Sequence, residues 1–543
     1  MSRSYIIRDP LALHREGVYR YRGINVWRDN ISVAEYVSEM LKPCLGPKGM
    51  YKLVINKFGD IVTTKDAAVI LDKMELHHPV GKILRDAAKT IEKNVGDGAK
   101  TAIILIGELL RRAERLANLK IKVSKIIEGY SIAYNVALKQ LEQSKIEIRN
   151  IQSDTLKKIF LTFFQSRNID SAPHLAELTA EAAIHNIKTL DTRRFFERDN
   201  IVVTKKLGKS LGDSKLINGV IINKKIAHPS MPRVVKNAKI ALLQMALKID
   251  EFRHLQPYKY HITIKDPEDL ETFLATEEEI VREMVKKIVA VGANLVICRK
   301  KIGPTASQLL ADNGVMAISR VLREEDFKAI AAITGARVVS SLDDLGTDDL
   351  GSADVVRVEK YGDEEVIVIE GCKKRGGYTI LLRGESERLL EEAEHAIQDA
   401  LRCMSLLVEN PALVAGGGAI EEELAIAIRN ESLKYPGKEQ IAMHAFANSI
   451  EKITQLLISN VGQDPLMVLP ELRAKHLNGE HYYGFDQSSG RVANMVELSI
   501  LEPYKVKEQV LKTAFETAVM LLRIDDVVDR RHAKRHAGEL GGQ

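Results

Sequence analysis

Long apolar runs, paired cysteines and a strong excess of one charge are all missing from this sequence of 543 residues. No apolar run reaches about 18 residues without a charge, and the start MSRSYIIRDP lacks the apolar core of a signal peptide. The four cysteines, Cys44, Cys298, Cys372 and Cys403, are widely separated and form no CxxC pair or metal-ligand spacing. These absences predict a cytoplasmic protein with reduced thiols and no membrane partner.

Charge and composition exclude further classes of protein. Lys plus Arg (79) exceeds Asp plus Glu (74) by only 5, which does not require a nucleic-acid partner. The visible concentration of basic charge is the tail at residues 530–536, which is interpreted as a solvated terminus or as a site for acidic partners. With 45% hydrophobic and 28% charged residues, the chain is typical of a globular protein, and its length predicts about three or four domains.

Periodicity divides the chain into helical ends around a mixed centre. Short apolar runs at 51–55 and 61–64, separated by a turn that contains glycine, predict the two strands of a hairpin. Alternation of short apolar runs with helical stretches in the centre predicts an α/β domain, and the order helical, mixed, helical indicates that the two ends form one discontinuous domain. The predicted helices are 30–41, 101–119, 124–141, 266–289, 385–407, 419–457 and 506–522, and the predicted central strands are 201–205, 219–222, 240–245, 295–298, 316–319 and 366–369.

Two glycine-rich turns near the N-terminus are candidate phosphate sites. They are Leu45-Gly46-Pro47-Lys48-Gly49 and Gly96-Asp97-Gly98-Ala99-Lys100-Thr101, the second of which opens a long helix. Asp97 has the chemistry of a magnesium ligand there, although an aspartate at a helix start also serves as an N-cap and glycines also form plain turns. A Walker A loop is excluded because Ala99 stands where that motif needs glycine.

Two further carboxylates and a glycine triplet are open to both structural and functional interpretations. Asp66, after the hairpin, has the chemistry to orient a water molecule or to cap a turn. Asp399 lies on a predicted helix where an ion pair with Arg402 explains it equally well. The glycines at 416–418 permit either close ligand approach or a helix-entry turn.

Together these segments resemble the group II chaperonins, the archaeal thermosome and its eukaryotic cytosolic relative. The resemblance spans nearly the whole chain, in a fixed order of motifs. They include LGPKGM (45–50), GDIVTTKDAAVIL (59–71), VGDGAKTA (95–102), HPSMP (228–232), TILLRG (379–384), VAGGGAIE (414–421) and LLRIDD (521–526).

The resemblance implies three nested domains and a double ring. It implies a mainly helical equatorial ATP-binding domain at 1–145 and 406–526 and a small α/β intermediate hinge domain at 146–214 and 371–405. An α/β apical domain at 215–370 would bind substrate and carry a helical protrusion at about 250–284, and 527–543 would be a flexible tail. Implied partners are unfolded polypeptides and identical or sister subunits, with ATP and Mg²⁺ as cofactors.

The resemblance also assigns roles to single residues. Asp97 matches the magnesium-coordinating aspartate, and Asp66 and Asp399 match the two carboxylates that position or activate the attacking water. Glu502 matches an acidic residue that contacts ribose, and Lys507 a nearby cation. The residues that match the nucleotide cradle are Leu45, Gly46, Pro47, Gly98, Ala99, Lys100, Thr101 and Gly417.

The departures from the family pattern fall in the same pocket. Ala99 and Lys100 stand at hydroxyl positions of the phosphate turn, and Cys44 stands at another. Each hydrogen bond to a charged phosphate contributes roughly 1.5 to 3 kcal/mol, so these losses predict weaker nucleotide binding. Lys100 either adds a compensating cation or holds the pocket in a phosphate-bound-like state without nucleotide; the sequence leaves both interpretations open.

The prediction is therefore a molecular chaperone, a chaperonin ring subunit that hydrolyses ATP with reduced turnover. Two alternatives stay open: a catalytically silent structural subunit of a mixed ring, and a chaperonin-like scaffold that forms no ring. Retention of Asp66, Asp97 and Asp399 favours hydrolysis, and no specific nucleic-acid partner is expected.

Overall fold

The structure is a computed structural model, which describes residues 19–22, 24–56, 59–148, 151–190, 193–248, 267–362, 364–372 and 377–529. The chain forms two compact units: the first joins the two ends of the chain with Lys158–Ile169, and the second consists of Asp170–Ile397 with Gln152–Lys157. The first part of the expected protrusion, 250–266, and the basic tail at 530–536 lie outside the described residues.

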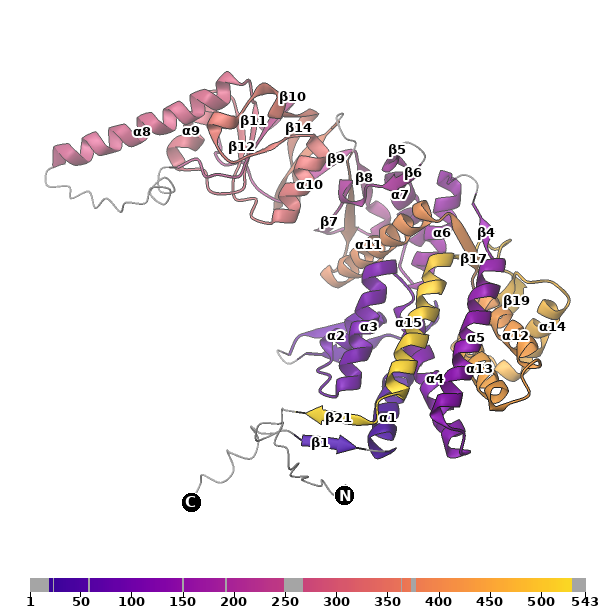
Figure 1. Ribbon diagram of the computed structural model, residues 1–543. Helices are drawn as coiled ribbons and strands as arrows, with labels where there is room; N and C mark the ends of the chain where they lie inside the picture. The colour runs from indigo at the N-terminus through magenta and orange to yellow at the C-terminus, as the bar shows by residue number, and fades with distance from the viewer. Residues whose placement is uncertain are drawn as a thin grey trace, which may run out of the picture. The chain divides into compact units, whose positions relative to one another are not determined.

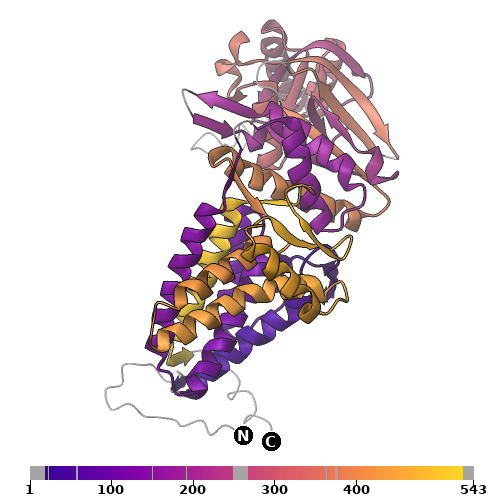
Figure 2. The ribbon, with the colours of Figure 1, turned by 90° about the vertical axis from the view of Figure 1, so that its right-hand side faces the viewer.

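The first unit is a bundle of long helices, which Figures 1 and 2 show running side by side. Helix α4 lies in its middle and packs against α1, α3, α13 and α15. Every residue of α4 from 102 to 110 is buried, Glu108 included, as expected for a central helix. The helices of this unit are α1 (Ile24–Leu41), α2 (Ala67–Lys73), α3 (Pro79–Val95), α4 (Ala99–Asn118), α5 (Val123–Gln143), α12 (Ala419–Ser432), α13 (Lys438–Ser459), α14 (Pro465–Leu477) and α15 (Tyr504–Leu522).

Short strands close the ends of this bundle. The predicted hairpin is confirmed: β2 (Lys52–Ile55) pairs antiparallel with β3 (Ile61–Thr64), with Lys52 opposite Thr64 and Ile55 opposite Ile61. A small sheet joins β17 (Ala412–Ala415) to β20 (Leu501–Pro503) and β4 (Ile146–Glu147), and β18 (Tyr483–Asp486) pairs with β19 (Arg491–Asn494). At the two ends of the described chain, β1 (Tyr19–Arg22) pairs antiparallel with β21 (Asp526–Asp529).

The second unit is built around a mixed seven-stranded sheet with the order β12-β11-β10-β14-β15-β9, in which β13 also pairs with β10. Pairs of β10 with β11 and β13, and of β11 with β12, are parallel, whereas β10–β14, β14–β15 and β15–β9 are antiparallel. Its strands are β9 (Gly219–Ile222), β10 (Val234–Leu243), β11 (Leu295–Cys298), β12 (Met316–Ile318), β13 (Val338–Val339), β14 (Gly351–Tyr361) and β15 (Glu364–Glu370).

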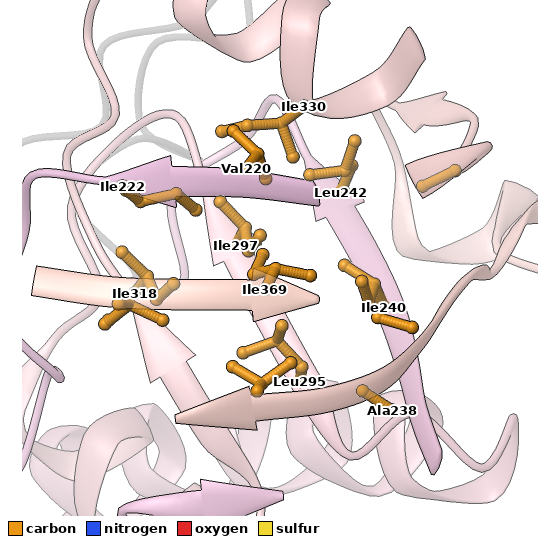
Figure 3. Close-up of a cluster of buried hydrophobic side chains, with 14 of the residues drawn as sticks. Val220, Ile222, Ala238, Ile240, Leu242, Leu295, Ile297, Ile318, Ile330 and Ile369 are labelled. Carbon is orange, nitrogen blue, oxygen red and sulfur yellow. The ribbon is translucent and has the colours of Figure 1, made fainter. Parts of the chain in front are cut away.

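Apolar side chains on one face of this sheet form a core with helix α10 (Glu324–Thr334). Figure 3 shows Ile240, Leu295, Ile297 and Ile369 gathered there, with Ile330 contributed by α10. Near-continuous β-branched runs of this kind are typical of strands buried on both faces. Helices α8 (Pro267–Ala290) and α9 (Pro304–Asp312) contribute to a second core of the same unit.

The second unit also contains a three-stranded sheet with the order β7-β16-β8. Helices α6 (Ser153–Ser166) and α11 (Glu387–Glu409) each begin in the second unit and end in the first. The others are α7 (Ala172–His185), β5 (Ile187–Leu190), β6 (Arg193–Phe196), β7 (Ile201–Leu207), β8 (Lys215–Ile217) and β16 (Tyr378–Gly384).

The predicted fold class, a mainly helical part and an α/β part in one multidomain chain, is confirmed. The helical stretch predicted at 419–457 is two helices, because Pro436 and Gly437 interrupt it and α13 begins after Gly437. The boundaries of a separate intermediate domain stay a prediction. Among the described helices, none combines the length and the apolar character that a membrane span requires.

Candidate functional site

A cavity of about 380 Å³ opens within the first unit. Its walls come from the 45–48 loop, the turn before α4, the last turn of α6 and the following residues, the glycine turn before α12, and β20 with the start of α15. Every predicted cradle residue except Ala99 lines it. Those lining residues are Leu45, Gly46, Pro47, Asp97, Gly98, Lys100, Thr101, Gly417, Glu502 and Lys507.

The turn between α3 and α4 presents backbone N–H groups to this cavity. Gly96 ends α3 with a left-handed φ of 74°, and Gly98 is the N-cap of α4 with φ 90°. A Cβ atom on Gly98 would lie 2.5 Å from Cγ2 of Val510 on α15, so only glycine fits this close approach. The first N–H groups of α4 have no partner within the helix, which makes this turn suitable for an anion. Because Gly98 is the cap, Asp97 does not serve as the N-cap.

A second glycine turn, at residues 45–49, forms the opposite wall. Gly46 has a φ of 80°, and a Cβ atom there would lie 2.6 Å from the side-chain oxygen of Gln487. The side-chain amide of Asn460 donates to the carbonyls of Leu45 (2.9 Å) and Lys42 (3.1 Å). These contacts hold the loop in one conformation beside the cavity.

A third wall joins the glycine turn before α12 to a buried ion-pair group. The backbone N–H of Phe485 donates to the carbonyl of Gly417 (2.8 Å). The Lys507 ammonium lies 2.5 Å from a carboxylate oxygen of Glu421 and 2.9 Å from one of Glu502. Burial lowers the pKa of Lys507, but the two carboxylates more than offset this and hold the pKa above its usual range. Lys507 is therefore a permanent cation, already paired.

Two of the three predicted catalytic and metal-binding carboxylates, Asp97 and Asp399, lie at one guanidinium group, that of Arg167. Of the three, Asp97 lines the cavity, whereas Asp66 and Asp399 do not. Nη1 of Arg167 donates to Oδ2 of Asp399 (2.7 Å), and its Nη2 lies 3.7 Å from Oδ1 of Asp97 and donates to the carbonyl of Gly96 (3.4 Å). Burial lowers the pKa of Arg167, but Asp399, Asp97 and Asp66 together raise it above its usual range. Arg167 thus links Asp66, Asp97 and Asp399 electrostatically within the first unit.

Asp399 is buried on α11, with only 4% of its side chain exposed. Its other oxygen accepts from Arg402 (2.6 Å), so the predicted ion pair between these residues is confirmed. Burial raises the pKa of Asp399, and Arg167 only partly offsets this. A carboxylate with a raised pKa accepts a proton more readily than an ordinary aspartate.

The structure shows Asp66 in one of the two roles considered for it, that of a cap. Its Oδ1 accepts from the backbone N–H of Val69 (3.0 Å), so it is the N-cap of α2. Its charge also acts on Arg167, Lys100 and Glu92, each of whose pKa values it raises. The cap fixes the carboxylate in place, and its second oxygen Oδ2 takes no part in that bond.

Lys100, the most unusual residue of the pocket, points toward the 42–44 turn. Its Nζ donates to the carbonyl of Cys44 at 3.3 Å. Burial lowers the pKa of Lys100, although Asp66 and Asp97 act in the opposite direction. Lys100 lines the cavity, and its ammonium is held by a neutral partner while the charges of two carboxylates act on it.

Sequence reasoning missed three charged residues of this site: Arg167, Glu421 and Glu92. Arg167 follows the end of α6 in a stretch without any recognisable motif, so no sequence signal indicates it. Glu421 lies in the first turn of α12, where its position after three glycines is the signal that would have found it. Glu92 lies on α3, 4.0 Å from Arg402, and burial with the charges of Asp66 and Asp399 raises its pKa to about 7.

Changing Glu92 to glutamine is expected to stabilise the protein more at pH 8 than at pH 5. A pKa of about 7 in the folded chain, against 4.5 ordinarily, means that stability is lost as pH rises through this interval. Glutamine removes that loss, which we expect to amount to about 1 to 3 kcal/mol at pH 8. Thermal unfolding at both pH values measures it, with the exposed Glu471→Gln as control. Equal shifts at the two pH values would contradict the expectation.

Comparison with known proteins points to one family. The chain matches the model of the TCP-1/cpn60 chaperonin family over residues 37–532. It is 40% identical over 538 residues to the thermosome subunit alpha of Archaeoglobus fulgidus, covering 98% of each chain. It is also 41% identical over 521 residues to a thermosome subunit of Methanopyrus kandleri (96% of this chain, 95% of the relative). A thermosome subunit of Methanocaldococcus jannaschii is 40% identical over 540 residues, covering 98% of each chain.

Proposed function

Because this chain belongs to the TCP-1/cpn60 chaperonin family, we propose that it is an ATP-hydrolysing subunit of a group II chaperonin double ring. Its general function, that of a chaperonin subunit in protein folding, follows from the family membership. The finer proposal is that ATP and Mg²⁺ bind in the cavity of the first unit and that ATP is hydrolysed there at a reduced rate. The observation that carries it is that Asp97 lines the cavity and shares the Arg167 guanidinium with Asp399, while the charge of Asp66 acts on the same guanidinium.

The cavity has the size and chemistry that a nucleotide needs. Its volume of about 380 Å³ lies in the usual range for small-molecule sites, about 300 to 1,000 Å³. Gly46, Gly98 and Gly417 have positive φ values and pack so closely against neighbouring protein atoms that a Cβ atom would clash. The N-terminus of α4 offers unpaired N–H groups. Glu502, in β20 at the same cavity, supplies a carboxylate for a ribose hydroxyl.

Asp97 is the residue that fits a magnesium ion. Its side chain is 38% exposed and its carboxylate has one long contact, to Arg167 at 3.7 Å. Carboxylate oxygens together with phosphate oxygens are the usual ligands of Mg²⁺ in nucleotide sites. When bound, the ion would offset negative charge on the phosphates.

Asp399 and Asp66 supply the groups that handle water. The raised pKa of Asp399 suits it to accept the proton of an attacking water molecule. Asp66, fixed by its bond to Val69, suits the orientation of that water. Arg167 contributes a cation where negative charge develops, in a partly water-excluded site.

Reduced turnover is proposed from the residues that replace hydroxyl groups. Ala99 offers no side-chain donor, and the Cys44 thiol is buried with a raised pKa. The Lys100 ammonium bonds to the carbonyl of Cys44, which would compete with a phosphate group for it. Both features support weaker binding of the phosphates than hydroxyl residues would give.

The remaining proposals concern domains and partners. We assign an equatorial domain to 1–145 and 406–526, an intermediate domain to 146–214 and 371–405, and an apical domain to 215–370. The helical first unit and the seven-stranded sheet of the second unit support this division. Identical or sister subunits would complete the ring, and unfolded polypeptides would be bound by the apical domain.

The experiment is single-turnover ATP hydrolysis by the purified assembly after its mass has been measured by size exclusion with light scattering. We expect a mass of many subunits, consistent with a double ring, and hydrolysis that requires Mg²⁺ and stops when EDTA removes it. A ring without hydrolysis would instead indicate a structural subunit. A monomer or small oligomer would indicate a scaffold that forms no ring.

A further inference from the structure

A second group of ligand-type side chains lies in the first unit, outside the nucleotide cavity. It consists of Glu423 on α12, His476 in the last turn of α14, and His481 in the turn that leads into β18. One ligand atom from each lies within 4.8 Å of the other two. Oε2 of Glu423 is 2.7 Å from Nδ1 of His476 and 3.0 Å from Nδ1 of His481. None of the three residues lines the cavity.

The orientation of His476 points to a cation between these groups. Its Nε2 lies 2.9 Å from the carbonyl oxygen of Tyr483, which only accepts hydrogen bonds, so this nitrogen carries the ring proton. A neutral imidazole then presents a bare lone pair on Nδ1, facing the Glu423 carboxylate at 2.7 Å. Two acceptors at that distance repel each other unless a proton or a metal ion lies between them.

The surroundings resemble those of metal ligands. A histidine that binds a metal usually donates its other N–H to a carbonyl or carboxylate, as His476 does to Tyr483. The side-chain amide of Gln140 donates to Oε1 of Glu423 (3.0 Å), which leaves Oε2 directed at both rings. His476 is fully buried and Glu423 nearly so, whereas His481 is 54% exposed and gives an ion access from solvent.

We propose that Glu423, His476 and His481 bind one divalent transition-metal ion of the zinc class. Oε2 of Glu423 and Nδ1 of each histidine would be the ligands, with water in the fourth position, a ligand number familiar from zinc sites. Two imidazoles and one carboxylate suit Zn²⁺, Co²⁺ or Ni²⁺ rather than Mg²⁺, which prefers oxygen ligands. Tetrahedral bonds of about 2.0 to 2.1 Å place ligand atoms about 3.3 Å apart. Oε2 of Glu423 would move apart from Nδ1 of His476 by about 0.6 Å and from Nδ1 of His481 by about 0.3 Å to reach that spacing.

The site would join α14 to α12 and to the turn before β18, and both α12 and β18 form part of the wall of the nucleotide pocket. Helix α12 begins directly after Gly417 and Gly418, and β18 contains Phe485, whose N–H donates to the carbonyl of Gly417. A metal bound to Glu423 and His481 would therefore fasten α12 to the turn before β18. Any ligand that binds only the folded chain raises its unfolding temperature.

The test is metal titration of the nucleotide-free, chelator-stripped assembly, with Co²⁺ absorption as the coordination readout and competition by Zn²⁺. We expect one equivalent per chain, with the visible bands of tetrahedral Co²⁺, and a rise in unfolding temperature. His481→Ala, at an exposed position, should weaken binding more than tenfold, whereas the exposed His77→Ala should change nothing. The histidines of the C-terminal tail are present in both variants, so any metal that they bind contributes equally to the two titrations.

Glu423→Gln gives a second variant that keeps the shape of the site, and it should also fail to bind the one equivalent of metal ion. Identical titrations of the native protein and both site variants would overturn the proposal, as would a native protein that binds no metal ion in the titration. Since no nucleotide is present, this result is independent of whether the protein hydrolyses ATP.

Discussion

Replacement of Asp97 by alanine is expected to lower single-turnover ATP hydrolysis about 1,000-fold. The carboxylate is the side chain at the cavity that fits a magnesium ion, and stabilisation of a transition state by such an ion amounts to several kcal/mol. About 4 kcal/mol corresponds to three factors of ten in rate. The variant should also bind ATP more weakly, because the same ion would bridge the protein and the phosphates.

Two matched variants separate chemistry from folding. Asp399→Asn should lower hydrolysis about 100- to 10,000-fold while nucleotide affinity changes little, because Asp399 acts on water. Asp86→Ala, on the exposed face of α3, should leave both quantities unchanged. If the native protein and Asp97→Ala show the same background rate, the chain is a structural subunit and the proposed catalysis is wrong.

Replacement of Lys507 by methionine is expected to lower the free energy of unfolding by about 3 kcal/mol. The ammonium group pairs with Glu421 and Glu502, and its removal leaves two carboxylates facing each other in a largely buried site. Breaking a buried pair from one side costs roughly 3 to 5 kcal/mol, and partial exposure of Glu502 places the value at the lower end. Denaturant unfolding of the purified assembly measures it.

The control for this change is two residues away. Lys505 is 38% exposed and pairs with Glu508, so Lys505→Met should cost less than about 1 kcal/mol. The double change Lys507→Met with Glu421→Gln should recover part of the stability, because it also removes one uncompensated charge. If Lys505→Met and Lys507→Met lowered the free energy of unfolding equally, burial of the Lys507 ion pairs would make no contribution to stability.

Much of the fold follows from local sequence signals. The hairpin of β2 and β3 is predicted by its short polar turn, and α4 by its apolar pattern and glycine start. Such signals act over a few residues and need no tertiary context. The break between α12 and α13 is also local, at Pro436 and Gly437, and a stricter use of the proline rule would have predicted it.

In the candidate site, some residues can be predicted from the sequence and others cannot. The glycine turns with Asp97 are visible in the sequence because a positive φ beside a helix start restricts the residue type. Arg167 is invisible because its role depends on carboxylates 70 and 232 positions away along the chain, at Asp97 and Asp399. The pKa values of Glu92 and Asp399 likewise depend on burial, which only tertiary packing sets.

The pairing of β1 with β21 has a consequence for how the protein is made. The partner of Tyr19–Arg22 lies about 500 residues later, so a ribosome that adds about 5 to 20 residues per second completes β21 roughly 25 to 100 s after β1. During that time Asp170–Ile397 already has its whole sheet, whereas α1 to α5 still lack α12 to α15. The apolar faces of α1 to α5 therefore stay exposed until the later helices are synthesised. The nascent chain itself passes through a state with exposed apolar surface, which is the kind of state that chaperones bind.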